Sequence, residues 1–439
     1  MKINHYPTWP VERISLSLLT YSMIVIPLLL WQFGPRLSLL NLLIGYTVVW
    51  SVLRIVAALD KKRAPLNSGT PQNLAVSVLV AAHNEESVVE QLVNNLTKLQ
   101  YPNLEILIVD DRSTDRTAEI LANLREANDR FDFYSRPAEC KHGKAAVLNE
   151  AIQKLKGDVI VVFDADAQVE ADFVTRVLPY FADDNVAAVQ ARKTASNGAT
   201  NVLTRCQQFE FALDGYLQSK RDTIFGAVEL RGNGMVIRRS ALQTLGGFNE
   251  DNLTEDLDLC TRMHAKGWDL RYASDVQVWE EAMPALLPLM KQRVRWTEGS
   301  LIRYLEHARE ILWSPKVAWR TKLDLIQFVF ECILPVWLFT EIGLMIFRWW
   351  QGSLIQMPTL YAVPAAVVLS FYFVIVAFQG VGRFEKPSVV QSTVGAISVY
   401  SYLTFLWMPI VFIVLFGILT RSQRNSVWVK TEHFGSDPR

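Results

Sequence analysis

Two aspartates stand one residue apart at the end of an apolar run, where they could hold a metal ion. The run Val159 to Phe163 contains no polar residue and is followed by Asp164, Ala165 and Asp166. So uniformly apolar a segment predicts a buried strand of a parallel sheet, and open α/β sheets bind ligands at the carboxyl ends of such strands. Carboxylate oxygens suit a hard divalent cation, which neutralises a diphosphate. An isolated Asp-x-Asp triplet is more often a surface turn, so other site elements must accompany it.

A second acidic group, Thr254-Glu255-Asp256, precedes an amphipathic segment that predicts a helix over residues 257–266. Asp256 is the candidate catalytic base, with Glu255 beside it. A carboxylate at a helix N-terminus lies near the positive end of the helix dipole, so we expect the pKa of Asp256 to be lowered. Ionised in this way, it could take the proton of an acceptor hydroxyl. The alternative is a helix cap without a chemical role.

A third group, Gln292-Arg293-Val294-Arg295-Trp296, falls in a helical segment rich in leucine. Gln292 and Arg295 are three positions apart and share one helix face, with Trp296 beside them. Arg295 can donate paired hydrogen bonds to a diphosphate, and Trp296 offers a flat wall to an acceptor. The alternative is an interfacial helix whose arginine and tryptophan anchor to lipid headgroups.

Strand and helix patterns alternate through the first half of the charged middle region. Strands are predicted at 75–82, 104–109 and 131–135 and a helix at 143–156, before the strand that ends at Asp164. This βαβα order predicts an α/β fold with a parallel, doubly wound sheet. The polar clusters all follow strands, so they are expected at one end of that sheet.

These three groups occur in the order found in family 2 glycosyltransferases, and the chain resembles that family from Leu74 to Trp296. The resemblance implies a GT-A fold, which is Rossmann-like and doubly wound, and a UDP-sugar donor. It also implies transfer with inversion of the anomeric centre. By the same resemblance Asp166 is the better metal ligand, Asp164 contacts the ribose or the metal, and the metal is Mg²⁺ or Mn²⁺.

The resemblance further implies a nucleotide pocket after the first two predicted strands. A carboxylate there can accept hydrogen bonds from the uracil N–H and the ribose hydroxyls. Arg112 stands where the family usually has glycine, which puts the shape of that turn in doubt, and Asp111 could instead cap the next helix. The implied nucleotide-sugar residues are Ala81, Asn84, Glu85, Asp110, Asp111, Lys144, Asp164, Gln292, Arg295 and Trp296.

The acceptor side depends on weaker patterns. Gly232-Asn233-Gly234 predicts a tight loop where backbone could approach an acceptor, and Trp296 is the other predicted acceptor residue. Trp428-x-Lys430-Thr431 resembles an element that closes over the nucleotide in relatives. Each of these patterns could equally be structural.

Two stretches, 227–234 and 292–305, resemble cyanobacterial β-monoglucosyldiacylglycerol synthases. This resemblance implies transfer of glucose to a lipid such as 1,2-diacylglycerol, giving a β-glycolipid. Processive synthases of hyaluronan, cellulose or poly-N-acetylglucosamine extend a growing glycan and share the other motifs, so they remain the alternative. An inactive membrane scaffold is a remote third.

Both ends of the chain are apolar enough to predict membrane helices. A helix needs roughly 20 apolar residues to cross a bilayer. Lys61-Lys62-Arg63 places the middle region in the cytoplasm by the positive-inside rule. The membrane is expected to be a bacterial plasma membrane or a thylakoid. The number of C-terminal passes stays open. The candidate segments are 14–33, 37–59, 325–347, 359–378 and 394–420.

The predicted organisation divides the chain into five regions. On the interfacial helices, Leu301 and Leu305 are expected to face lipid. The 44 basic and 44 acidic residues leave no net charge, which gives no reason to expect a nucleic acid partner. The regions are two membrane helices (1–63), a cytosolic GT-A domain (64–283), interfacial amphipathic helices (284–322), membrane helices (323–420) and a cytosolic tail (421–439).

Overall fold

The computed structural model describes residues 74–327 and 357–421, together with residues 343, 346–347, 349–352 and 435. The strands are β1 (Val76–Ala82), β2 (Leu104–Asp110), β3 (Asp132–Ser135), β4 (Val159–Phe163), β5 (Gln168–Val169), β6 (Val186–Ala195), β7 (Met235–Arg238) and β8 (Asp269–Glu280). The helices are α3 (Val89–Leu96), α4 (Thr117–Ala127), α5 (Lys144–Ile152), α6 (Phe173–Val177), the 3₁₀ helix η1 (Leu178–Ala182), α7 (Val202–Thr223), α8 (Arg239–Thr244), α9 (Glu255–Ala265), α10 (Leu286–Trp313), α12 (Met357–Phe384) and α13 (Val389–Thr420).

The strands form one mixed sheet, which corrects the prediction of a wholly parallel one. Its order is β3-β2-β1-β4-β7-β6-β8-β5. β1 to β4 pair in parallel, as their alternation with helices predicts, but β7 runs antiparallel to β4 and β6, and β5 runs antiparallel to β8. A parallel neighbour needs a long crossover, usually a helix. No helix separates β4 from β5, but helices do separate β6 from β7 and β7 from β8, so the element order alone does not predict the antiparallel direction of β7.

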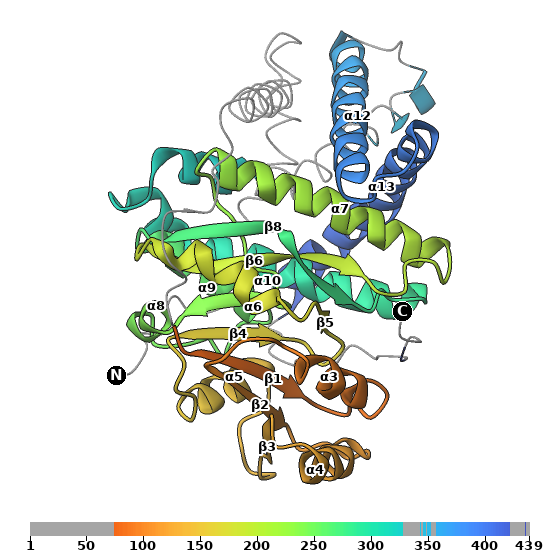
Figure 1. The fold of residues 1–439 in the computed structure, drawn as a ribbon. Coiled ribbons are helices and arrows are strands. Elements are labelled where there is room, and N and C mark those ends of the chain that lie inside the picture. The colour runs from red at the N-terminus through yellow and green to blue at the C-terminus, as the bar shows by residue number, and fades with distance from the viewer. Residues whose placement is uncertain are drawn as a thin grey trace.

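Both faces of the sheet are covered by helices, which explains the uninterrupted apolar run in β4. Alternate residues of this strand point to opposite faces. Val161 and Phe163 pack in a core with α3 and α6, whereas Ile160 and Val162 pack in a second core with α5, α8 and α9. Figure 1 shows the sheet with these helices around it. The strands are therefore held rigidly, and so are the loops at their carboxyl ends.

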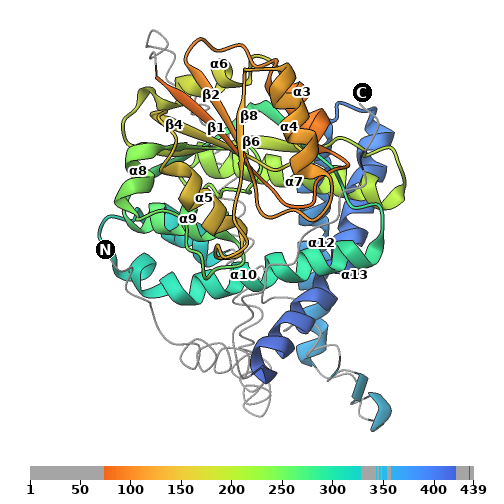
Figure 2. The ribbon, with the colours of Figure 1, turned by 90° about the horizontal axis from the view of Figure 1, so that it is seen from below.

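Two long helices connect the sheet domain to the C-terminal helices. α7 packs against α12 and α13 through a buried cluster that includes Tyr216 and Ala396. α10 runs along the sheet domain and crosses α13, as Figure 2 shows, and Leu301 packs there against Ile410. Leu301 is 4% exposed, and Leu305 is partly buried against the same cluster. The expectation that these leucines face lipid is therefore wrong, because α13 covers them.

One helix in the described part of the chain is long and apolar enough to cross a membrane. It covers Val389–Ile418 of α13 and has a mean hydropathy of 2.1. The predicted segment 359–378 falls within α12, whose apolar stretch Ser370–Phe384 is shorter. The division into five regions stays a prediction. The predicted elements outside the described residues are 14–33, 37–59, most of 325–347 and Trp428–Thr431.

Candidate active site

One cavity brings most of the predicted site residues together. It has a volume of about 310 Å³, begins at the carboxyl ends of β1, β2 and β4, and has further walls from α7, α9, α10 and α13. The groups that follow β1, β2 and β4 converge there, as their positions after strands predict, whereas the groups around Asp256 and Trp296 reach the cavity from the helices α9 and α10. The predicted residues that line it are Ala81, Glu85, Asp111, Lys144, Asp164, Asp166, Gly232, Glu255, Asp256, Gln292, Arg295 and Trp296.

Asp111, just after β2, is held between two arginines. Its carboxylate accepts hydrogen bonds from Arg112 Nε at 2.8 Å and from Arg136 Nη1 at 2.7 Å. Burial would raise the pKa of Asp111, but these hydrogen bonds outweigh burial and lower the pKa, so the side chain is an ionised acceptor. Arg112 has a left-handed φ of 60°, a conformation that favours glycine, and the turn nevertheless forms.

Asn84 and Asp110 shape the loops around Asp111. Asn84 is also left-handed, with φ 56°, and its Oδ1 accepts a hydrogen bond from the Thr114 N–H at 2.7 Å. Asp110 is buried and accepts a hydrogen bond from the Ser113 N–H at 3.3 Å. These contacts lie within the loops, and direct binding of a nucleotide by Asn84 or Asp110 stays a prediction.

The two aspartates after β4 form an all-oxygen group that suits Mg²⁺ or Mn²⁺. Asp166 accepts a hydrogen bond from the Glu281 N–H at 2.7 Å, which orients its carboxylate. Lys144 Nζ lies 2.5 Å from Asp164 and 3.3 Å from Glu255. Burial lowers the pKa of Lys144, but the two carboxylates outweigh it and raise the pKa. Lys144 is therefore a fixed positive charge in the cavity, where a diphosphate would need one.

Asp256 lies in the first turn of α9 and faces the cavity, but its electrostatics differ from the prediction. Its Oδ1 accepts a hydrogen bond from the Leu257 N–H at 2.8 Å. Burial, followed by the charge of Glu255, raises the pKa of Asp256 to about 6, against the lowering effect of Lys144. The expected lowering is wrong, because burial and a like charge outweigh the helix dipole. A pKa just below neutrality suits a general base, which must be ionised and still bind a proton.

Gln292, Arg295 and Trp296 line the cavity from neighbouring positions of α10. Burial lowers the pKa of Arg295, while nearby carboxylates act to raise it, so the guanidinium lies among the acidic site residues. Two cations lie over the Trp296 ring: the Arg293 guanidinium carbon is 4.2 Å from the ring centroid and Lys193 Nζ is 5.3 Å from it. These contacts favour a site role over anchoring to headgroups.

The Gly232-Asn233-Gly234 turn lies directly against the site residues Asp164 and Asp256. Gly232 has φ 76°, and a Cβ there would lie 3.3 Å from Asp256 Oδ2. Asn233 is fully buried, and its Oδ1 accepts a hydrogen bond from the Asp164 N–H at 3.2 Å. A Cβ at Gly234 would come within 2.6 Å of Val278, so this glycine allows close packing on β8. Contact between this turn and an acceptor stays a prediction.

A buried ion pair between the aspartates and Trp296 was missed from the sequence. Lys193 of β6 lies 2.8 Å from Glu280 of β8, and their side chains are 10% and 11% exposed. Burial raises the pKa of Glu280, with Lys193 acting against this and Asp166 adding to it. The feature of the sequence that could have indicated this pair is a charged residue near the end of each of two strands. Both residues line the cavity, so they are candidates to contact sugar hydroxyls.

The cavity also reaches α13, which the sequence did not connect with catalysis. Trp407, within that helix, lines the cavity together with Phe211 of α7. Glu210 ties three helices together beside them: it lies 2.7 Å from Arg293 of α10 and accepts a hydrogen bond from the Tyr402 hydroxyl of α13 at 3.1 Å. An apolar helix is thus part of the site wall.

A separate group of possible metal ligands, Asp258, Glu306 and His307, joins α9 to α10. Asp258 already has strong partners: Arg262 Nε lies 2.6 Å and His307 Nε2 lies 2.9 Å from its oxygens. Burial would raise the pKa of Asp258, but these partners lower it. We interpret this group as internal bonding that anchors α9.

Comparisons with known proteins agree with this arrangement. The glycosyltransferase-like family 2 model matches residues 71–299. The chain is 34% identical over 432 residues to the β-monoglucosyldiacylglycerol synthase of Synechocystis sp., covering 96% of this chain and 88% of that protein. A synthase of the same name from Nostoc sp. is 41% identical over 263 residues, which cover 59% of this chain and 56% of that protein. The poly-β-1,6-N-acetyl-D-glucosamine synthase of Staphylococcus aureus is 28% identical over 270 residues.

Among solved structures, the fold is similar to that of the mannosyltransferase PcManGT from Pyrobaculum calidifontis, in complex with GDP-Man and Mn²⁺. The TM-score is 0.57 at 18% identity, and the match covers 91% of this chain and 99% of that chain. This likeness confirms a GT-A-like glycosyltransferase fold. The family model spans more than half of the 439 residues, and the Synechocystis relative is similar along nearly the whole chain. The chain therefore belongs to glycosyltransferase family 2 and is a glycosyltransferase.

Proposed function

We propose that this enzyme transfers glucose from UDP-glucose to the free hydroxyl of a 1,2-diacylglycerol and forms a β-monoglucosyl lipid. The activity named for the Synechocystis relative, whose similarity extends over 96% of this chain, supports the proposal. The enzyme would act at a bacterial plasma membrane or a thylakoid, with its catalytic domain on the cytoplasmic side.

The observation that carries the lipid acceptor is the continuity between the cavity and an apolar helix. The cavity that contains Asp164, Asp166 and Asp256 is also lined by Trp407. This tryptophan lies in the part of α13 that is long and apolar enough to cross a membrane. Phe405 of the same helix is 80% exposed, and a bilayer would cover such a side chain. A diacylglycerol in that bilayer would reach the site with its hydroxyl first.

At the donor end, Asp111 would accept hydrogen bonds from the uracil or ribose. Asp164 and Asp166 would hold Mg²⁺ or Mn²⁺, which when bound neutralises the diphosphate. Lys144 would add a fixed positive charge. Arg295 would donate paired hydrogen bonds to the leaving diphosphate, whose negative charge grows as the bond to the sugar breaks.

At the acceptor end, Asp256 would act as general base. The lipid oxygen would attack the anomeric carbon from the face opposite UDP and form the new C–O bond. The bond between that carbon and the diphosphate oxygen would break, and its electron pair would leave with UDP. The hydroxyl proton would pass to Asp256. Trp296 and Phe211 would cover the reacting groups and limit access of water, which would otherwise hydrolyse the donor.

The proposal is tested by supplying the purified full chain with UDP-glucose, UDP-galactose or UDP-N-acetylglucosamine, each with and without diacylglycerol. We expect UDP-glucose to be consumed when the lipid is present, and the lipid to gain the mass of a single hexose that does not grow with time. A long polysaccharide made from a UDP-sugar without added lipid would overturn the proposal. That result would favour a processive synthase, the class to which the Staphylococcus aureus relative belongs by name.

A further inference from the structure

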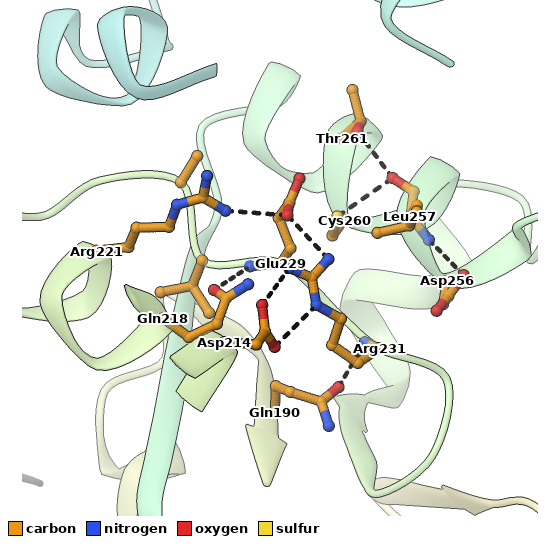
Figure 3. Close-up of polar contacts among 12 residues, drawn as sticks. Gln190, Asp214, Gln218, Arg221, Glu229, Arg231, Asp256, Leu257, Cys260 and Thr261 are labelled. Carbon is orange, nitrogen blue, oxygen red and sulfur yellow. Dashed lines mark hydrogen bonds and ion pairs between the residues drawn. The ribbon is translucent and has the colours of Figure 1, made fainter. Parts of the chain in front are cut away.

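A buried glutamate behind the catalytic cavity is surrounded by three arginines. Glu229 precedes the glycine turn, is fully buried and lies 2.9 Å from both Arg221 Nη1 and Arg231 Nη1. Figure 3 shows these side chains converging on it. Arg303 of α10, which is also fully buried, forms an ion pair with the other oxygen of Glu229. We call Glu229 and these three arginines the Glu229 cluster.

Arg303 connects this cluster to the helix that carries the proposed base. Its Nη1 donates a hydrogen bond to the Leu257 carbonyl oxygen at 3.0 Å and lies 3.4 Å from Thr261 Oγ1. Leu257 directly follows Asp256, and its own N–H donates to the Asp256 carboxylate. One guanidinium therefore spans Glu229 and the first turn of α9.

Arg231 connects the cluster to the other side of Asp256. It also pairs with Asp214 of α7 at 2.7 Å, so its side chain is held at two points (Figure 3). The next residue, Gly232, is the one at which a Cβ would lie 3.3 Å from Asp256 Oδ2. A displacement of Arg231 would move the backbone that borders the carboxylate.

Burying so many charges is costly, and replacing buried ion pairs by well-packed apolar residues often leaves stability equal or better. A fixed geometry is one reason to keep such a cluster. We propose that Glu229 and Arg303 are positioning residues: they clamp the first turn of α9 and the Arg231–Gly232 turn around Asp256 and so set where the base meets the acceptor hydroxyl. This inference rests on the proposed role of Asp256 as the base.

The same clamp ties the base to the acceptor wall. Arg303 follows Trp296 by about two turns of the same helix, so a rigid α10 carries both. The position of the Asp256 carboxylate is thereby fixed relative to Trp296, against which the acceptor would lie. A displacement of about 1 Å between reacting groups costs on the order of 100-fold in rate.

The test compares two Arg→Lys variants that face the same carboxylate. Arg303→Lys keeps the positive charge beside Glu229 but removes the second guanidinium nitrogen, which donates a hydrogen bond to the Leu257 carbonyl oxygen. Arg221→Lys makes the same chemical change at the other oxygen of Glu229, where the arginine also lies 3.3 Å from Asp324. For each purified full-length variant, kcat, the KM for UDP-glucose and Tm are measured with diacylglycerol as acceptor.

We expect Arg303→Lys to lower kcat on the order of 10- to 100-fold with little change in the KM for UDP-glucose. Arg221→Lys should keep a kcat close to that of wild type, even if its Tm falls as far. Equal kcat values in the two variants, or losses of kcat that follow Tm, would overturn the inference. If Asp256→Asn kept normal turnover, the base assignment would fail instead, so the two failures are distinguishable.

A milder variant decides the question if Arg303→Lys does not fold. The Tyr304 hydroxyl donates to Glu229 at 3.2 Å and lies 3.2 Å from Arg303 Nη2. Tyr304→Phe removes this one group. A lower kcat with an unchanged KM for UDP-glucose would support the positioning role, and a kcat equal to wild type would contradict it.

Discussion

Replacing Asp256 with asparagine should have opposite effects on catalysis and on stability. Asparagine cannot accept the proton, so transfer should fall by about 100-fold or more, as is usual when a general base is lost. The binding of UDP should persist, because Asp111 and Lys144 are unchanged. At neutral pH the variant should also unfold at a higher temperature than wild type, because it no longer buries a charged carboxylate.

The size of the stability effect follows from the pKa of Asp256, which is raised from 3.8 to about 6 by burial and Glu255. One pKa unit corresponds to about 1.4 kcal/mol, so ionisation costs the folded protein at most about 3 kcal/mol. The side chain is partly exposed to the cavity, where water screens its charge, so we expect roughly 1 to 2 kcal/mol.

The sign of the pH dependence follows from the same shift. A carboxyl group whose pKa is higher in the folded protein contributes stability that is full below the unfolded value and lost as the pH rises through the folded value. Wild type should therefore match the asparagine variant at about pH 4 and become less stable than it as the pH rises through about 6. Above about pH 7 the difference should be constant.

The assay is thermal unfolding at a series of pH values, with transfer measured in the same samples. Asp184→Asn is the control, because the Asp184 side chain is 94% exposed and should show no such difference. A difference in Tm between wild type and Asp256→Asn that does not vary with pH would refute the electrostatic reasoning. Near-normal transfer by the variant would refute the base.

The metal, acceptor and nucleotide ends of the cavity each give a further expectation. Excess chelator, or Asp166→Ala, should abolish transfer, and added Mg²⁺ or Mn²⁺ should restore the chelated wild type; full activity in chelator would remove the metal from the mechanism. Trp407→Ala should raise the KM for diacylglycerol by roughly tenfold and leave the KM for UDP-glucose unchanged, whereas Trp313→Ala, at an 81% exposed tryptophan, should change neither. Asp111→Asn should weaken binding of UDP by on the order of tenfold in calorimetry, and unchanged binding would exclude it from the nucleotide pocket.

The donor side of the site was predictable because its signals are local. The apolar run before Asp164 and Asp166 indicates a buried strand. The position of the two aspartates after this run indicates the carboxyl end of the strand, and their carboxylates indicate a metal site. The carboxyl ends of the parallel strands β1, β2 and β4 lie at the same end of the sheet, so the polar residues that follow these strands lie close together. The prediction failed beyond β4, where β7 lies antiparallel between β4 and β6 although the helix α7 precedes it, so an alternation of strands and helices does not fix strand direction there.

The remaining features depend on contacts between distant segments. The pKa of Asp256 could not be read from its helix position, because burial and Glu255 decide it. Leu301 belongs to an amphipathic pattern whose apolar face could contact either lipid or another helix. In the structure it packs against α13. Nothing near Arg303 in the sequence indicates a partner at Glu229, 74 positions away.

The structure of the product formed from UDP-[¹³C]glucose and diacylglycerol tests the central claim most directly. NMR of the purified lipid reports the number of labelled sugars per molecule and the configuration of each anomeric centre. We predict one glucose per diacylglycerol, linked through the free hydroxyl, with the axial anomeric proton of a β-glucoside. An α-linked glucose would contradict inversion by attack opposite UDP, and a labelled polymer free of lipid would contradict the lipid acceptor.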